Sequence, residues 1–254
     1  MLMKRWIPMI LLLSLLLCAC GTVSPGLAEE SSVLSVPEPS VLEVTNAPTP
    51  VPVVIRDALY ESGSYSDNVG NSWDYVLRIP MIETSGEDAV RLNRAVYAAL
   101  EPAVKEAKNS MADGCSLIVN RVDYTVFVNG QLISILCETD TDWGFESYYT
   151  INYDASTHSE VERPQLLQRY GMLGEDFIGK AKMLVEDYFQ EHYSTVPRDD
   201  FYWDRHDRSV DAQNFKEDCC LFVNDSGQLC MIPKLYSFAG GDYYYHIFAL
   251  DGSA

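Results

Sequence analysis

No apolar stretch of this sequence is long enough to form a membrane-spanning helix. Such a helix needs about twenty apolar residues, whereas the longest apolar segment extends only from Ile7 to Leu17. The sequence also lacks the G-x-S-x-G motif of a nucleophile elbow, the H-E-x-x-H motif of zinc hydrolases and any C-x-x-C pair. None of its four histidines stands at metal-ligand spacing from a cysteine. These absences argue against an enzyme and predict no metal and no cofactor.

Basic residues are scarce. The chain has 18 Lys and Arg against 37 Asp and Glu, a formal charge of −19 at pH 7. Loss of residues 1–19, which include Lys4 and Arg5 and no acid, would change this charge to −21. Such a chain repels nucleic acid and anionic lipid, and its field attracts cationic partners in a salt-dependent way. The charge therefore argues against nucleic-acid binding; its alternative role is only to keep the protein soluble and away from the membrane surface.

Residues 1–21 have the layout of a lipoprotein export signal. Lys4 and Arg5 supply a positive start, an apolar segment follows, and Leu17-Cys18-Ala19-Cys20-Gly21 places small residues on both sides of a cysteine. We expect cleavage after residue 19 and lipidation of Cys20, which would anchor the protein to the outer face of the cell membrane. Cleavage elsewhere, or an uncleaved anchor, is the alternative.

The segment after the signal differs in composition from the rest of the chain. Residues 20–53 are rich in Ser, Pro, Val, Thr and Glu and have no aromatic side chain. Proline disfavours a helix and nothing periodic is available to bury, so we expect a partly extended, disordered tether. Residues 54–254 are long enough for one extracellular domain, or for two subdomains (54–112 and 113–254) that share a sheet.

The apolar pattern of residues 54–254 predicts an α+β fold, mainly an antiparallel sheet packed against two main helices. The helices are expected at Glu87–Met111, where Pro102 should kink or divide the helix, and at Gly174–Tyr193. The first helix should bury one stripe, formed by Leu92, Val96, Ala99, Ala103 and Ala107. Strands are expected at 53–60, 73–82, 115–128, 131–138, 147–153, 219–223, 228–235 and 243–250, with an Asn129-Gly130 hairpin turn and a short helix at 164–170.

Five cysteines follow Cys20, namely Cys115, Cys137, Cys219, Cys220 and Cys230. An odd number is unusual for a disulfide-bonded exported domain, which favours buried free thiols. One disulfide between Cys220 and Cys230, across the turn at 224–227, stays open as an alternative.

One loop combines acidic and aromatic residues between two expected strands. Residues 138–146 contain four carboxylates and two large aromatic side chains, and aromatic anchors within a charged surround suit a basic protein partner. The candidate ligand-binding residues are Asp140, Asp142, Trp143, Phe145 and Glu146. In the alternative, Trp143 and Phe145 turn inward and the acids are merely solvated.

Two further clusters are less informative. Residues 199–207 are acidic but lack the alternating spacing and glycine of a calcium loop, so we expect a solvated loop there. Tyr243, Tyr244 and Tyr245 should alternate between core and surface on a terminal strand.

Three segments together resemble a known family. They are the strand pair around Val128-Asn129-Gly130 and Leu132–Ile135, the run Thr150–Asp154 with Gln165-Leu166-Leu167 after it, and the run Leu221–Gly241 with Tyr236 and the Ala239-Gly240-Gly241 end. This pattern is similar to the extracellular domain shared by the lysozyme-sensing anti-sigma factor of Gram-positive bacteria and the non-catalytic N-terminal part of certain peptidoglycan deacetylases. The resemblance covers most of residues 72–250 and implies a non-catalytic domain that binds a lysozyme-like cationic protein.

The sequence departs from this family at two turns. Asp140–Phe145 stands where the family commonly has a turn with glycine and histidine, and Thr157-His158 stands where Thr-Gly usually follows the Tyr-Asp pair. Both differences put the family's binding mode in doubt. The anti-sigma relatives also carry a sigma-binding region and a membrane helix that this sequence does not show.

The sequence therefore favours a cell-surface lipoprotein with a non-catalytic domain that binds a lysozyme-like protein or a cell-wall component. Two alternatives stay open. One is a structural partner of an envelope protein, which would expose a large apolar patch. The other is a wall hydrolase with two carboxylates in one cleft, because glycoside hydrolysis needs only such a pair.

Overall fold

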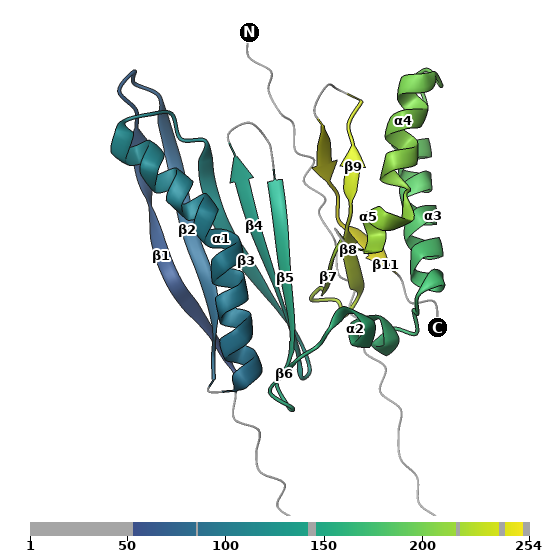
Figure 1. The fold of residues 1–254 in the computed structure, drawn as a ribbon, viewed down its shortest axis with the longest axis horizontal. Coiled ribbons are helices and arrows are strands. Elements are labelled where there is room, and N and C mark those ends of the chain that lie inside the picture. Colours follow the sequence, from purple (N-terminus) through teal and green to yellow (C-terminus); the bar gives the residue numbers. More distant parts are fainter. Residues whose placement is uncertain (1–52, 85, 142–145, 217–218, 239–241, 251–254) are drawn as a thin grey trace, which may run out of the picture. The chain divides into compact units, whose positions relative to one another are not determined.

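The computed structural model describes residues 53–84, 86–141, 146–216, 219–238 and 242–250, and these form the α+β fold that the sequence predicts (Figure 1). The predicted signal, Cys20 and the tether up to residue 52 lie outside these residues. The strands are β1 (Val54–Ser66), β2 (Ser72–Glu83), β3 (Val119–Asn129), β4 (Leu132–Thr141), β5 (Glu146–Asp154), β6 (Ser159–Glu160), β7 (Cys220–Val223), β8 (Leu229–Ile232), β9 (Lys234–Tyr236), β10 (Tyr243–Tyr245) and β11 (Phe248–Leu250). The helices are α1 (Glu87–Asp113), α2 (Arg163–Arg169), α3 (Glu175–His192), α4 (Asp200–Ser209) and α5 (Ala212–Lys216). No helix among the described residues has the length and apolar character to cross a membrane.

The larger sheet has six strands in the order β1-β2-β3-β4-β5-β6. Its neighbouring strands are antiparallel except β2 and β3, which α1 connects and which pair in parallel. Gly130, with φ of 61°, lies in the predicted tight turn between β3 and β4. The possible subdomain boundary after residue 112 falls at the last residue of α1, and α1 and β3 on either side of it contribute to the same hydrophobic core.

Helix α1 covers one face of this sheet (Figure 1). It runs continuously through Pro102 and ends at Gly114, which adopts the left-handed φ of 67° that favours glycine. The predicted stripe is correct at Leu92, Val96 and Ala107. It is wrong at Ala99, which is exposed, because Leu100 and Val104 turn their larger side chains to the sheet instead.

The second half of the described chain has its own core. Strands β11-β8-β7 form a three-stranded sheet, β10 pairs with β9, and α3 packs against these elements with Phe177, Ala181, Val185 and Phe189 buried. The single strand expected at 243–250 is two short strands, β10 and β11. All three tyrosines of β10 are half-buried, so the expected alternation between core and surface is wrong.

The acidic segment expected as a loop at residues 199–207 instead forms helix α4. The Asp199 side chain accepts a hydrogen bond from the Tyr202 backbone N–H at 3.0 Å and so caps the helix. Tyr202 is only 2% exposed and inserts into the core. The cap at Asp199 and the burial of Tyr202 therefore stabilise a helix here although the segment contains many charged side chains.

The two sheets meet through β7, which packs against β4 and β5. A small apolar cluster of Leu136, Phe222, Cys230 and Ile232 fills this contact. Beside it, buried polar groups join the layers: Asn152 Nδ2 donates to the Leu221 carbonyl at 2.9 Å, and the Val223 N–H donates to Ser134 Oγ at 3.0 Å.

Candidate functional site: an acidic and aromatic sheet face

Two of the five candidate binding residues lie in the described part of the chain. Asp140, near the end of β4, is directly opposite Glu146, at the start of β5. Directly opposed residues of an antiparallel pair point to the same side of the sheet, so these two carboxylates lie next to each other. The other three candidates, Asp142, Trp143 and Phe145, fall at positions 142–145, outside the described residues.

More acidic and aromatic side chains belong to the same face. Alternate residues of a strand share a face, which places Glu138 beside Asp140 and Tyr148 beside Glu146. Register pairs Asp123 of β3 with Glu138. We refer to Asp123, Glu138, Asp140, Glu146 and Tyr148, with Tyr243 and Tyr245 of β10, as the acidic–aromatic face.

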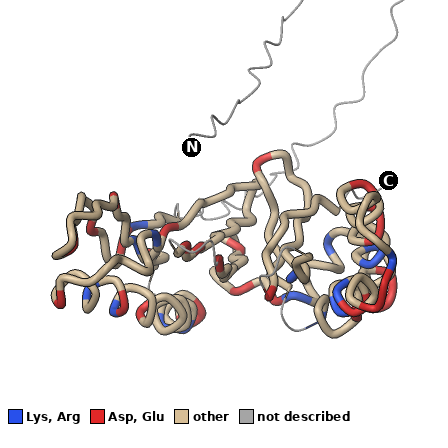
Figure 2. Tube along the Cα trace, turned by 90° about the horizontal axis from the view of Figure 1, so that it is seen from above, with Lys and Arg blue, Asp and Glu red and all other residues tan. Residues whose placement is uncertain are grey.

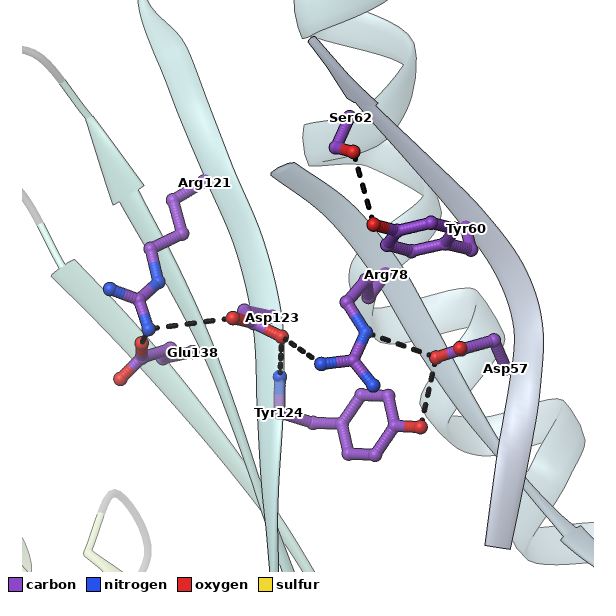
Figure 3. Close-up of polar contacts among 8 residues, drawn as sticks. All are labelled: Asp57, Tyr60, Ser62, Arg78, Arg121, Asp123, Tyr124 and Glu138. Atoms are coloured by element: carbon purple, nitrogen blue, oxygen red, sulfur yellow. Dashed lines mark hydrogen bonds and ion pairs between the residues drawn. The ribbon is translucent and has the colours of Figure 1, made fainter. Parts of the chain in front are cut away.

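Two arginines partly neutralise the β1 and β3 side of this face (Figure 3). Arg78 lies between Asp57 and Asp123, with 3.1 Å from Nε to Asp57 Oδ1 and 3.1 Å from Nη1 to Asp123 Oδ1. Arg121 Nη2 is 2.6 Å from Glu138 Oε1 and 3.4 Å from Asp123 Oδ2. Both arginines thus already bind carboxylates within the sheet.

Asp140 and Glu146 have no such cation. Among the described residues, no Lys or Arg lies within ion-pair distance of either carboxylate. Counting Asp57, this network has five carboxylates and two arginines, so it keeps an excess of negative charge. Arg121 stands opposite Asp140 in the register of β3 and β4, but its ion pairs are with Asp123 and Glu138. An unpaired acidic surface of this kind attracts a cationic ligand.

The pKa of Glu138 responds to burial and to these neighbouring negative charges. Burial raises the pKa of Glu138, the nearby Arg121 lowers it, and the surrounding carboxylates Asp123, Glu146 and Asp140 raise it again, with a net increase above the ordinary value. Burial is thus the main cause of the raised pKa of Glu138, and the neighbouring carboxylates add to it.

Tyrosine rings border these acids. Tyr148 Oη donates to Glu146 Oε2 at 2.8 Å, and burial together with the Glu146 carboxylate raises the pKa of Tyr148. The phenol is therefore a donor at neutral pH. The Tyr148 ring meets Tyr245 edge to face with 5.3 Å between centroids, and Tyr245 meets Tyr243 at 5.6 Å. Rigid aromatic rings beside unpaired carboxylates provide both contact area and charge for a protein partner.

The sequence alone does not place any tyrosine on this face. They come from β5 and β10, which are almost a hundred residues apart in the chain but in contact in the fold. The run of three tyrosines at 243–245 is a visible signal, but a strand alone cannot show which distant surface its rings face.

Three other features of the described residues concern metal ligands, the cysteines and an apolar cleft. No group of three or more His, Cys, Asp and Glu side chains in the described chain is arranged to hold a metal ion. None of the five described cysteines forms a disulfide. Cys220 and Cys230 do not pair across the hairpin, because Cys230 stands opposite Phe222. Cys137, Cys219 and Cys230 are buried as expected, but Cys115 is exposed. An apolar cleft of about 440 Å³ lies between β1, β2 and α1.

Comparisons with known proteins do not identify a family for this chain. No protein-family model matches the sequence, and no curated protein is significantly similar to it. The fold itself defines an α+β domain with a six-stranded, mainly antiparallel sheet, and the acidic–aromatic face is its candidate binding surface.

Proposed function

We propose that this chain is a lipid-anchored protein of the outer cell surface whose domain binds a cationic, lysozyme-like protein and catalyses no reaction. The single observation that carries the proposal is the pair Asp140 and Glu146, two neighbouring carboxylates that lack a cationic partner among the described residues. A lysine or arginine of a bound protein would supply that cation, and Tyr148 and Tyr245 would pack against its surroundings.

The resemblance to the lysozyme-sensing family supports the choice of ligand. One turn favours that resemblance on physical grounds. His158 has φ of 54° and is the only non-glycine residue with positive φ in the described chain. It stands where the family usually has glycine, the residue that adopts this conformation without strain. A backbone conformation that favours glycine at this position supports the resemblance although the residue differs.

The test is binding of the full-length protein to lysozyme, measured by calorimetry at low and at raised ionic strength. We expect saturable binding whose affinity falls as salt rises, because screening weakens attraction between exposed charges. Asp140→Asn with Glu146→Gln should weaken binding about tenfold or more, since it removes the two unpaired charges. Trp143→Ala should weaken it as well if the loop provides an aromatic anchor.

The matched control is Glu106→Gln with Asp225→Asn, which removes two exposed carboxylates elsewhere on the described surface. This variant should bind lysozyme nearly as well as the unmodified protein. An equal loss in both double variants would mean that net charge alone attracts lysozyme, and the face would not be the site. Absence of binding at low salt would refute the proposed function.

One observation favours a second function. Burial raises the pKa of Glu138, which lies beside Asp140 and Glu146, and glycoside hydrolases use a pair of neighbouring carboxyl groups of which one has a raised pKa. Digestion of purified cell wall by the full-length protein, lost in Glu138→Gln, would support this alternative over binding alone.

A further inference from the structure

A second candidate ligand site lies between α3 and α4 and shares no residue with the acidic–aromatic face. It is a cleft of about 410 Å³, within the size range of small-molecule sites. Its lining consists of Glu186, Gln190, Arg198, Tyr202, Trp203 and His206. One exposed indole among planar polar side chains is the feature that distinguishes this cleft.

The fold holds the Trp203 ring at the surface in a fixed position. Tyr202, its neighbour on α4, is buried and stacks on Phe238 with 5.1 Å between centroids. Consecutive residues of a helix point about 100° apart, so anchoring Tyr202 in the core directs Trp203 outward. Trp203 is 47% exposed, and its ring meets His206 edge to face at 5.4 Å. The indole therefore offers a rigid apolar surface to solvent.

Polar groups beside the indole are available to a ligand. Glu186 and Gln190 are four residues apart and so lie on one side of α3. Arg198 Cζ lies 3.9 Å from the centroid of the Tyr202 ring. Within the described residues, neither the Gln190 amide nor the Arg198 guanidinium has a hydrogen bond or an ion pair with another side chain or with the backbone. The cleft thus combines unused donors with the amide and carboxylate acceptors of α3.

The surrounding charge limits the chemistry of the ligand. Helices α3 and α4 together carry eight Asp and Glu against four Lys and Arg. Figure 2 shows acidic positions in red on these helices, with basic positions in blue among them. This field opposes an anion, while the polar side chains of Glu186, Gln190 and Arg198 in the lining do not suit a purely apolar molecule.

We propose that this cleft binds a neutral sugar ring of a glycan. The apolar C–H face of a pyranose packs on the Trp203 indole, and its hydroxyl groups, each a donor and an acceptor, hydrogen-bond to Gln190, Arg198 and Glu186. This inference does not depend on the acidic–aromatic face, which addresses a protein.

The experiment titrates the full-length protein with three probes: cellotriose and tri-N-acetylchitotriose, which are neutral, and a trimer of galacturonic acid, which is anionic. Binding is followed by calorimetry and by tryptophan fluorescence. We expect at least one neutral trisaccharide to bind saturably and the anionic one to bind more weakly. Trp203→Ala should weaken binding about tenfold, and Gln190→Ala about fivefold, through loss of ring contact and of a hydrogen bond.

Phe201→Ala is the matched control, because Phe201 lies two residues before Trp203 on α4, is also 47% exposed and does not line the cleft. It should bind like the unmodified protein. Gln190→Ala, on the exposed side of α3, keeps the test valid if Trp203→Ala does not fold. No saturable binding of either neutral sugar up to about 10 mM, equal affinities in the Trp203 and Phe201 variants, or preferential binding of the anionic trimer would each overturn the proposal.

Discussion

Asp154 is the most strongly held carboxylate among the described residues. Its Oδ2 is 2.6 Å from Arg169 Nη2, and its Oδ1 accepts from Ser156 Oγ at 2.6 Å and from the Ser156 N–H at 2.9 Å. Burial alone would raise the pKa of Asp154, but these hydrogen bonds and the Arg169 guanidinium lower it to about 2. The side chain therefore ties the end of β5 to α2.

A lowered carboxyl pKa makes the free energy of unfolding depend on pH. The contribution is complete above the unfolded pKa of 3.8 and disappears as pH falls through about 2, because the unfolded chain then binds the proton first. We expect Asp154→Asn to cost about 2 kcal/mol at pH 7 and progressively less between pH 4 and pH 2. Urea unfolding at several pH values measures this difference.

The control for Asp154→Asn is Asp225→Asn, an exposed turn residue, which should change the free energy of unfolding by less than about 0.5 kcal/mol. Equal effects of the two substitutions at pH 7 would show that the Asp154 contacts do not stabilise the fold.

Only part of the candidate site could be predicted from the composition of the sequence. Asp140 and Glu146 were accessible from the sequence because acids and aromatic residues crowd one short segment between two strands. Glu138 is part of that segment, but its raised pKa depends on burial in the folded chain and, to a lesser extent, on Asp123 of another strand. Tyr245 joins the face only through tertiary packing on Tyr148. The local sequence pattern therefore identifies the segment 138–146, whereas Asp123 and Tyr245 are recognised as its neighbours only in the folded structure.

The turn between β5 and β6 requires a left-handed residue but has a histidine. Positive φ costs a residue with a Cβ about 1 kcal/mol, and His158 Nδ1 is also buried without a hydrogen-bond partner in the described structure. We expect His158→Gly to raise the free energy of unfolding by about 1 kcal/mol, since glycine removes both penalties. Thermal and urea unfolding measure the change.

Asp225→Gly provides the opposite case in another turn. Asp225 does not have positive φ, so glycine there only increases the entropy of the unfolded chain and should destabilise the protein by up to about 1 kcal/mol. Destabilisation by both glycine substitutions would mean that the His158 side chain contributes contacts that outweigh its backbone strain.

At the scale of elements, long periodic segments were predictable and charged short ones were not. The apolar steps of α1 and α3 and the Asn129-Gly130 turn identify their elements directly. Helix α4 was missed because its charge hides the cap at Asp199 and the single inward Tyr202. The parallel pairing of β2 with β3 has no local signal, since it depends on how α1 returns the chain to the sheet.

At the scale of the whole described domain, a small polar network joins the six-stranded sheet to the three-stranded sheet. Ser134 and Asn152 are almost fully buried, Ser134 Oγ donates to Asn152 Oδ1 at 2.7 Å, and both side chains bond to the β7 backbone, at Val223 and Leu221. Buried backbone groups deprived of such partners cost about 1–3 kcal/mol each. The network therefore couples the core beneath α1 to the core around α3.

We expect the domain to unfold in one cooperative transition, with far-UV and near-UV circular dichroism giving the same midpoint. Ser134→Ala and Asn152→Ala should each destabilise it by about 1–3 kcal/mol. The double variant should lose less than the sum, because the two side chains act as one network. Ser64→Ala, which removes only the exposed hydrogen bond to Asp74, is the control and should cost less than about 0.5 kcal/mol.

Two separate transitions in the unmodified protein would show that the sheets unfold independently, and strictly additive losses would show that Ser134 and Asn152 do not cooperate.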